Sequence, residues 1–114
     1  MTKINMPYLN YIIDIINDIE DSMKNIPKNS FEKNKDKKDA NVRRLEIMSE
    51  AIKNISKELK NKYLNIKWEK FVDIKHIFTH HYFGVDSDIV WEIIKKDIPI
   101  LKAEIIKIKE KEKC

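Results

Sequence analysis

The chain has 114 residues, of which 42% are hydrophobic and 37% charged, so we expect one domain over 1–114 with a single core. One glycine and three prolines exclude a turn-rich β fold, because sandwiches and barrels need a turn about every 8–12 residues. The net charge of +4 permits binding to a polyanion without requiring it. The single cysteine, Cys114, excludes an intrachain disulfide, and no apolar run approaches the roughly 20 residues of a membrane span, so we expect a cytoplasmic protein.

The first half of the chain predicts two helices. Apolar residues recur at helical spacing over 7–26, and Pro27 ends this helix because proline disfavours a helical residue before it. The charged segment 28–41, with Phe31 as its one large apolar side chain, fits either a loop or the solvated start of the second helix. The helical period returns at 42 and continues to about 63.

The second half predicts three further helices. The third runs from about 67 to 82, with Gly84 well placed as a left-handed cap, and Asp86 or Ser87 caps the fourth. Pro99 marks the first turn of the fifth, whose end we expect to be frayed and solvated over 107–114. Together these patterns predict an all-α, up-and-down helical bundle of four main helices plus a short additional helix.

The three histidines of the chain lie within six residues, at His76, His80 and His81. Histidine serves readily as a general acid or base at neutral pH, so this segment is the first candidate site. On a helix, His81 falls on the apolar stripe that begins at Phe71, which favours a packed or capping role for it. His76 and His80 share a face away from the core.

Spacing alone does not make this segment a metal site or a catalytic pair. Two histidines four residues apart are too few for a closed zinc site, and Ile77 stands where a zinc-protease motif has glutamate, so we expect no metal. Lys75 and His80 are five residues apart, hence about 140° apart around a regular helix. The long lysine stem, a distortion near Gly84 or a second chain would be needed to bring both to one phosphate, and an ordinary surface lysine and histidine are the alternative.

The segment resembles the signature of HEPN-domain proteins, in particular the HepT-like ribonuclease toxins. Their pattern is arginine, four residues, histidine, any residue and tyrosine, usually followed by Phe-Gly. Lys75 stands at the arginine position here, His80 and Tyr82 fill the next two, and Phe83 and Gly84 follow. By this resemblance, the catalytic residues are Lys75, His80 and Tyr82.

The likeness continues on both sides of the motif, over 41–51, 85–94 and 97–102, and so covers nearly the whole chain. It implies a homodimeric helical bundle in which the motif lines a cleft between the two subunits. It also implies metal-independent RNA cleavage without a cofactor. Within such a cleft, Arg43 and Arg44 from the second helix, together with His76, are candidates for RNA binding.

The resemblance further implies a partner, a small nucleotidyltransferase that acts as antitoxin in a type VII (HEPN/MNT) toxin–antitoxin module and attaches AMP to Tyr82. Lys75 departs from the pattern, because lysine keeps the charge of arginine but lacks its planar, bidentate fork. An alternative is therefore a weak or inactive HEPN dimer that serves mainly as a binding partner of the nucleotidyltransferase. A generic bundle whose histidines merely pack would leave the long likeness unexplained.

Overall fold

The computed structural model describes residues 2–80 and 86–113, and every regular element in these ranges is helical. Four helices are long: α1 (Thr2–Met23), α3 (Lys35–Lys53), α5 (Trp68–His80) and α7 (Ile98–Lys111). The short elements are α2 (Lys28–Lys33), α4 (Lys57–Lys62), α6 (Ser87–Glu92) and a π-helical turn, η2 (Ile93–Asp97), which joins α6 to α7. The predicted all-α bundle with four main helices is confirmed, although the described residues hold more short elements than the single one expected.

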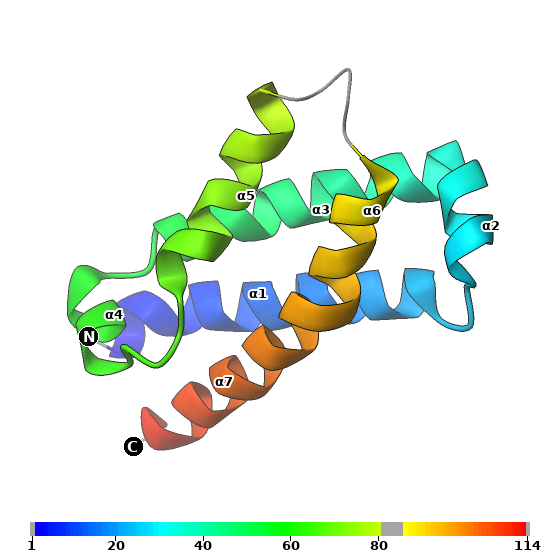
Figure 1. The fold of residues 1–114 in the computed structure, drawn as a ribbon. Coiled ribbons are helices and arrows are strands. Elements are labelled where there is room, and N and C mark those ends of the chain that lie inside the picture. The colour runs from blue at the N-terminus through cyan, green and yellow to red at the C-terminus, as the bar shows by residue number, and fades with distance from the viewer. Residues whose placement is uncertain (1, 81–85, 114) are drawn as a thin grey trace.

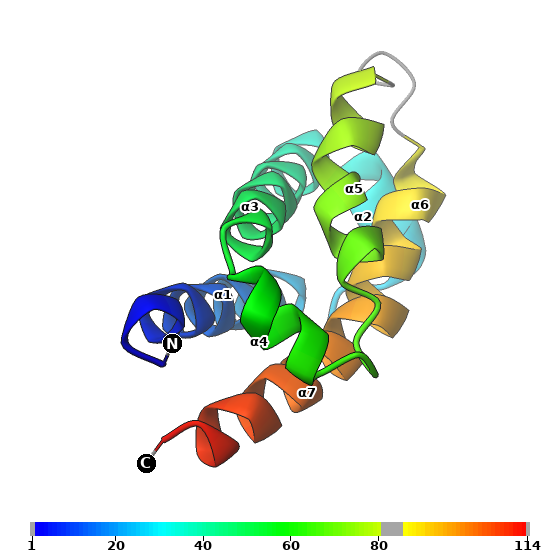
Figure 2. The same cartoon turned by 90° about the vertical axis from the view of Figure 1, so that its left-hand side faces the viewer.

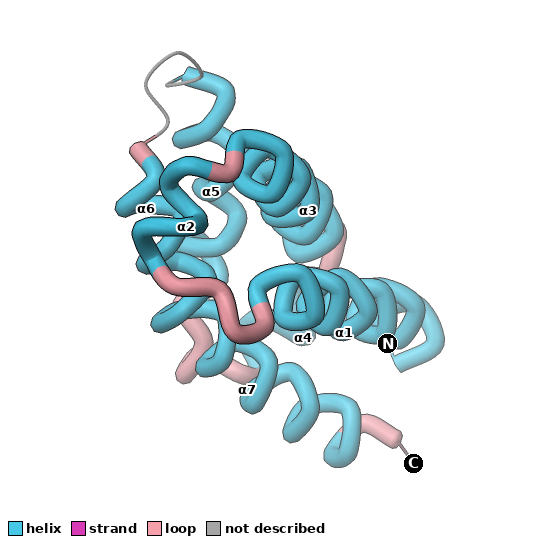
Figure 3. Tube along the Cα trace, turned by 90° about the vertical axis from the view of Figure 1, so that its right-hand side faces the viewer, coloured by secondary structure: helices cyan, strands magenta, loops and turns pink. Residues whose placement is uncertain are grey.

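The four long helices form one continuously packed bundle. α1 lies beside α3, α3 also packs on α5, and α7 returns to α1 (Figures 1 and 2). α2 and α4 lie at opposite ends of this bundle, with α2 nearest the viewer in Figure 3. The start of α1 and the end of α7 both lie at the α4 end (Figures 1 and 2). None of the described helices is both long and apolar enough to cross a membrane.

Segment 28–41 forms α2 and the start of α3, so the loop alternative for it is wrong. Phe31 of α2 is completely buried and its ring packs against Trp91 of α6, with the ring centroids 5.7 Å apart. Asn34 caps α3 by accepting a hydrogen bond from the Lys37 N–H to its side-chain oxygen. One apolar side chain thus anchors an otherwise solvated segment.

The first two predicted helices have wrong boundaries. α1 begins well before the predicted start, with Pro7 inside it, and ends at Met23, because Asn25 adopts a left-handed backbone with φ of 60°. The predicted helix over 42–63 is two helices. Asn5 of α1 and Ser56 exchange two hydrogen bonds at the break, Asn5 Nδ2 to Ser56 Oγ (3.0 Å) and Ser56 N to Asn5 Oδ1 (2.9 Å).

The end of α7 is helical and docked, so the expectation of a frayed 107–114 is wrong over 107–112. Ile108 is 1% exposed and Glu112 is 7% exposed. Glu112 Oε2 accepts hydrogen bonds from Lys62 Nζ (2.7 Å) and from the Tyr63 hydroxyl (2.6 Å). These bonds hold the pKa of the Glu112 carboxyl below its ordinary value and raise the pKa of Tyr63.

Candidate active site

α5 carries the candidate site, and a buried serine fixes its position on α3. Ser49 is 1% exposed, and its hydroxyl donates to the Val72 carbonyl (2.8 Å) while accepting the Lys75 N–H (3.3 Å). Ile74 and Phe78 are buried on the core side of the same helix. This arrangement sets the height and rotation at which Lys75 and the residues after it are presented.

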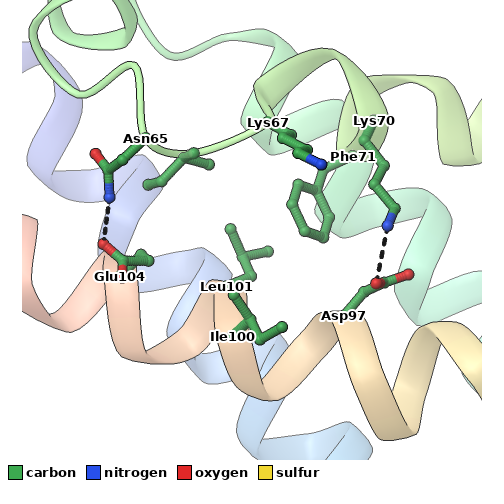
Figure 4. Close-up of a pocket in the computed structure, with 9 residues that line it drawn as sticks. Asn65, Lys67, Lys70, Phe71, Asp97, Ile100, Leu101 and Glu104 are labelled. Carbon is green, nitrogen blue, oxygen red and sulfur yellow. Dashed lines mark hydrogen bonds and ion pairs between the residues drawn. The ribbon is translucent and has the colours of Figure 1, made fainter.

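The start of α5 is held by η2 and α7 through two polar contacts (Figure 4). Lys70 Nζ pairs with Asp97 Oδ1 at 2.9 Å, and Asn65 Nδ2, just before α5, donates to Glu104 Oε2 at 2.7 Å. Phe71 lies between them and lines the same pocket as residues of α7. The base of the site is thus fixed by α3 on one side and by α7 on the other.

Lys75 is exposed and already has an anionic neighbour. Its Nζ lies 3.3 Å from Glu50 Oε2 of α3, and both side chains are about half exposed, at 48% and 47%. An ion pair so open to water contributes at most about 1 kcal/mol. An incoming phosphate can therefore replace the Glu50 carboxylate at little cost.

Lys75 and His76 line one surface groove between α3 and α5, which we call the α3–α5 groove. Its lining residues are Ser49, Glu50, Lys53, Val72, Asp73, Lys75 and His76. His76 is exposed, as predicted for a face away from the core. Because two carboxylates stand among the two lysines and the imidazole, the charge of this groove is mixed.

The remaining motif residues stand at or beyond the end of α5. His80 is the last residue of the helix, but its side chain lies outside the described part of the structure. His81, Tyr82 and Gly84 also lie outside the described residues. The convergence of Lys75, His80 and Tyr82, the packed role of His81 and the Gly84 cap all stay predictions.

The two arginines of α3 have different surroundings. Arg44 is half-buried, and its Nη1 donates to Asn41 Oδ1 (3.1 Å). Asn41 is completely buried and bonds to the Ser22 hydroxyl of α1, so Arg44 belongs to a polar contact between α1 and α3. Arg43 is exposed and precedes Glu50 by seven residues, which places both on one face of α3 about 10 Å apart along its axis.

Sequence reasoning missed Ser49 and Glu50 as site residues. Ser49 is a polar residue between Leu45 and Ile52 on the buried stripe of its helix, a pattern that marks a side chain with a buried partner. Glu50 carried no comparable signal, because its partner lies on another helix. Among the described residues, no group of three or more His, Cys, Asp or Glu side chains is arranged to hold a metal ion.

The chain combines an all-α bundle with the sequence motif that starts at Lys75 on α5, and this combination is typical of HEPN-like helical proteins. Comparison with known proteins identifies the family within this class. The family model described as "Ribonuclease HepT-like" matches residues 12–108. The chain belongs to this family, which confirms the resemblance found in the sequence. No solved structure matches the chain.

The chain is similar to relatives of about its own length and to one that is about twice as long. A protein of Methanocaldococcus jannaschii named "Gamma-glutamylcyclotransferase and putative RNase MJ0434" is 46% identical over 90% of this chain, which spans only 46% of that longer relative. "Probable ribonuclease HepT" of Thermococcus cleftensis is 34% identical over 96% of this chain and 100% of its own length. A protein of Caldanaerobacter subterraneus subsp. tengcongensis named "Putative RNase TTE0752" is 36% identical over 97% of this chain and 99% of its own length.

Proposed function

We propose that this protein is a metal-independent endoribonuclease that acts in the cytoplasm as the toxin of a type VII (HEPN/MNT) toxin–antitoxin module. The observation that carries the proposal is the family match over 12–108, which includes the motif from Lys75 to Gly84. The exposed position of Lys75 and His76 beside a surface groove supports it, since RNA must reach these groups from solvent.

The proposed reaction is an internal transfer at the RNA phosphate. The ribose 2′-oxygen forms a bond to the adjacent phosphorus while the bond from phosphorus to the 5′-oxygen breaks, leaving a cyclic phosphate and a 5′-hydroxyl. His80 takes the proton of the 2′-hydroxyl or delivers one to the 5′-oxygen. Lys75 stabilises the negative charge that develops on the phosphate oxygens, and Tyr82 hydrogen-bonds and positions the substrate.

The proposal includes a homodimer whose two copies place their motif segments around one cleft. Lys75 and His80 are about 140° apart on a regular helix, and a second subunit removes this obstacle because it supplies groups from the other side. Arg43, exposed on the face of α3 that carries Glu50, and His76 are the proposed RNA contacts. Arg44 is a weaker candidate, because it is already bonded to Asn41.

The proposed antitoxin is a small nucleotidyltransferase. It would transfer AMP from ATP to the Tyr82 hydroxyl, forming a phosphate ester and releasing pyrophosphate. The added group is a bulky anion that blocks the cleft and repels RNA. An intact mass increased by one AMP, lost in Tyr82→Phe, would identify the modification.

The decisive test of the enzyme is cleavage by the purified protein in the presence of a chelator, with the product ends identified. His80→Ala should lower the cleavage rate about a hundredfold to ten-thousandfold, because it removes the proton-transfer group. His76→Ala is the matched control, and we expect it to weaken RNA binding while cleavage persists. Cleavage by His80→Ala at the parent rate would refute the assigned role.

A second candidate function is a weak or inactive HEPN dimer that binds the nucleotidyltransferase. Lys75 at the family's arginine position favours it, because lysine lacks the planar, bidentate fork of arginine. This candidate predicts no RNA product but stable co-purification with the partner. A raised cleavage rate in Lys75→Arg would instead support the enzyme, because the planar fork binds phosphate through two parallel hydrogen bonds.

A further inference from the structure

A second groove lies at the start of α5 and is dominated by lysine. We call it the α4–α5 groove. Its lining residues are Lys57, Lys60, Asn61, Leu64, Ile66, Lys67, Trp68, Glu69 and Lys70. Four lysines thus stand against one carboxylate, and Trp68 closes the base because its Nε1 donates to the carbonyls of Lys60 (3.2 Å) and Tyr63 (3.0 Å).

The lysines of this groove differ in how far their charges are engaged. Lys70 is paired with Asp97 (Figure 4), whereas no ion pair within the described residues involves Lys57, Lys60 or Lys67. Burial lowers the pKa of the Lys60 ammonium and Lys57 lowers it further, against a raising effect of Glu69. The Coulomb attraction of a bound anion would offset both effects.

The two grooves adjoin. Lys53 lines the α3–α5 groove, and its backbone carbonyl accepts a hydrogen bond from Lys60 Nζ (3.4 Å), which lines the α4–α5 groove. Lys67 stands immediately before α5, whose first residue, Trp68, lies about 10 Å along the helix axis from Lys75, so the two lysines are at least about that far apart along α5. That distance corresponds to roughly three to four nucleotides at the 3.4 Å spacing of a stacked strand.

We propose that the α4–α5 groove is a second RNA-binding site, which holds the phosphates of a single strand whose cleaved bond lies at the motif. The inference rests on the proposed ribonuclease function. It adds the path that the RNA strand follows away from the motif, along the α4–α5 groove. Lysines bind phosphate as point charges and release counterions from it, so this contact is independent of sequence. Leu64, 76% exposed beside these lysines, offers an apolar surface to a base.

The test is the affinity of the full chain for a 2′-O-methylated strand of 12 nucleotides, which cannot be cleaved, measured over a range of salt concentrations. Lys57→Gln/Lys67→Gln should weaken binding about tenfold at low salt and reduce the slope of log affinity against log salt by about 1.4, or about 0.7 per phosphate contact. The loss of affinity in this double variant should be smaller for a strand of three nucleotides, which is too short to span both grooves.

Lys24→Gln/Lys35→Gln is the matched control, because it removes the same charge from exposed lysines at the α2 end of the bundle. Equal losses in the two double variants would reduce the effect to net charge and overturn the proposal. So would a parent-like affinity and salt slope in Lys57→Gln/Lys67→Gln. If the parent protein cleaves RNA while either of these results is obtained, the proposed ribonuclease function is retained and only the second binding site is refuted. A parent protein that neither binds nor cleaves RNA would refute both proposals.

Discussion

The two grooves beside α5 differ in how their cations are balanced. In the α3–α5 groove, Lys75 faces Glu50 at 3.3 Å and Asp73 stands nearby. In the α4–α5 groove, Lys57 and Lys67 have no ion pair with any described residue. A phosphate that enters the first groove must displace a carboxylate, whereas one that enters the second meets cations that are already available.

Under the two proposals above, this difference would separate RNA binding from the chemical step. An interaction that is weak with bound substrate and strengthens as charge develops on the phosphate accelerates the reaction, whereas uniform binding only lowers KM. Lys75, which is paired with the Glu50 carboxylate, suits an interaction that strengthens as the phosphate gains charge. The lysines of the α4–α5 groove suit uniform binding of the RNA strand. Variants that disturb one groove and spare the other can therefore test the division.

The largest of these effects is expected from Ser49→Ala, which loosens the α3–α5 groove. The change removes both the hydrogen bond to the Val72 carbonyl and the one from the Lys75 N–H, so stability should fall by about 1 kcal/mol, or about 5 °C in Tm. Displacement of α5 should also slow cleavage on the order of tenfold. Thermal unfolding and cleavage assays check both.

Ser30→Ala is its control, because Ser30 is exposed in α2. A Ser49→Ala protein with parental Tm and cleavage would show that the serine does not set the position of α5. A loss of Tm without any loss of cleavage would separate the packing of α5 from its proposed role in presenting Lys75.

A smaller effect is expected from Glu50→Gln, which removes the negative charge that faces Lys75 at 3.3 Å. Cleavage should rise about threefold, in keeping with an ion pair worth less than 1 kcal/mol. Glu46→Gln is the matched control, since it removes one negative charge a turn earlier on α3. Initial rates at low salt check the prediction, and a rate below that of the parent would mean that Glu50 assists the reaction.

Local pattern predicted the buried faces of the helices well. Leu9, Ile12 and Ile16 of α1 and Leu45 and Ile52 of α3 are all buried, as helical periodicity requires. The all-α class followed from the scarcity of glycine and proline, which a bundle tolerates and a sandwich does not.

Boundaries set by distant residues could not be predicted in the same way. Ser56 caps α4 by accepting the Leu59 N–H, a role that serine favours, but its bonds to Asn5, 51 residues away, have no signal in the local sequence. For the site, the motif identified Lys75 and His76 as neighbours on α5, but the Glu50 contact comes from another helix, 25 residues away. Such tertiary contacts override local propensity, and a single sequence does not reveal them.

The smallest effect on cleavage is expected from Glu112→Gln, which loosens only the support of the α4–α5 groove. Glu112 bonds to Lys62 and Tyr63 at the end of α4, the helix that carries Lys57 and Lys60. Because folding lowers the pKa of this carboxyl from its ordinary value of 4.5, its contribution to stability is full above that pH and is lost as the pH falls through the lowered value.

The Tm of Glu112→Gln should therefore lie below that of the parent at pH 7, and the difference should shrink as the pH falls through the lowered pKa of the carboxyl. Glu110→Gln, which removes an exposed carboxylate from the same helix, is the matched control and should follow the parent over the same pH range. RNA affinity should weaken slightly in Glu112→Gln, whereas loss of the α4 support leaves Ser49 and its hold on α5 in place. A Tm difference that stays undiminished as the pH falls well below 4.5 would mean that the glutamate acts through packing rather than through its charge.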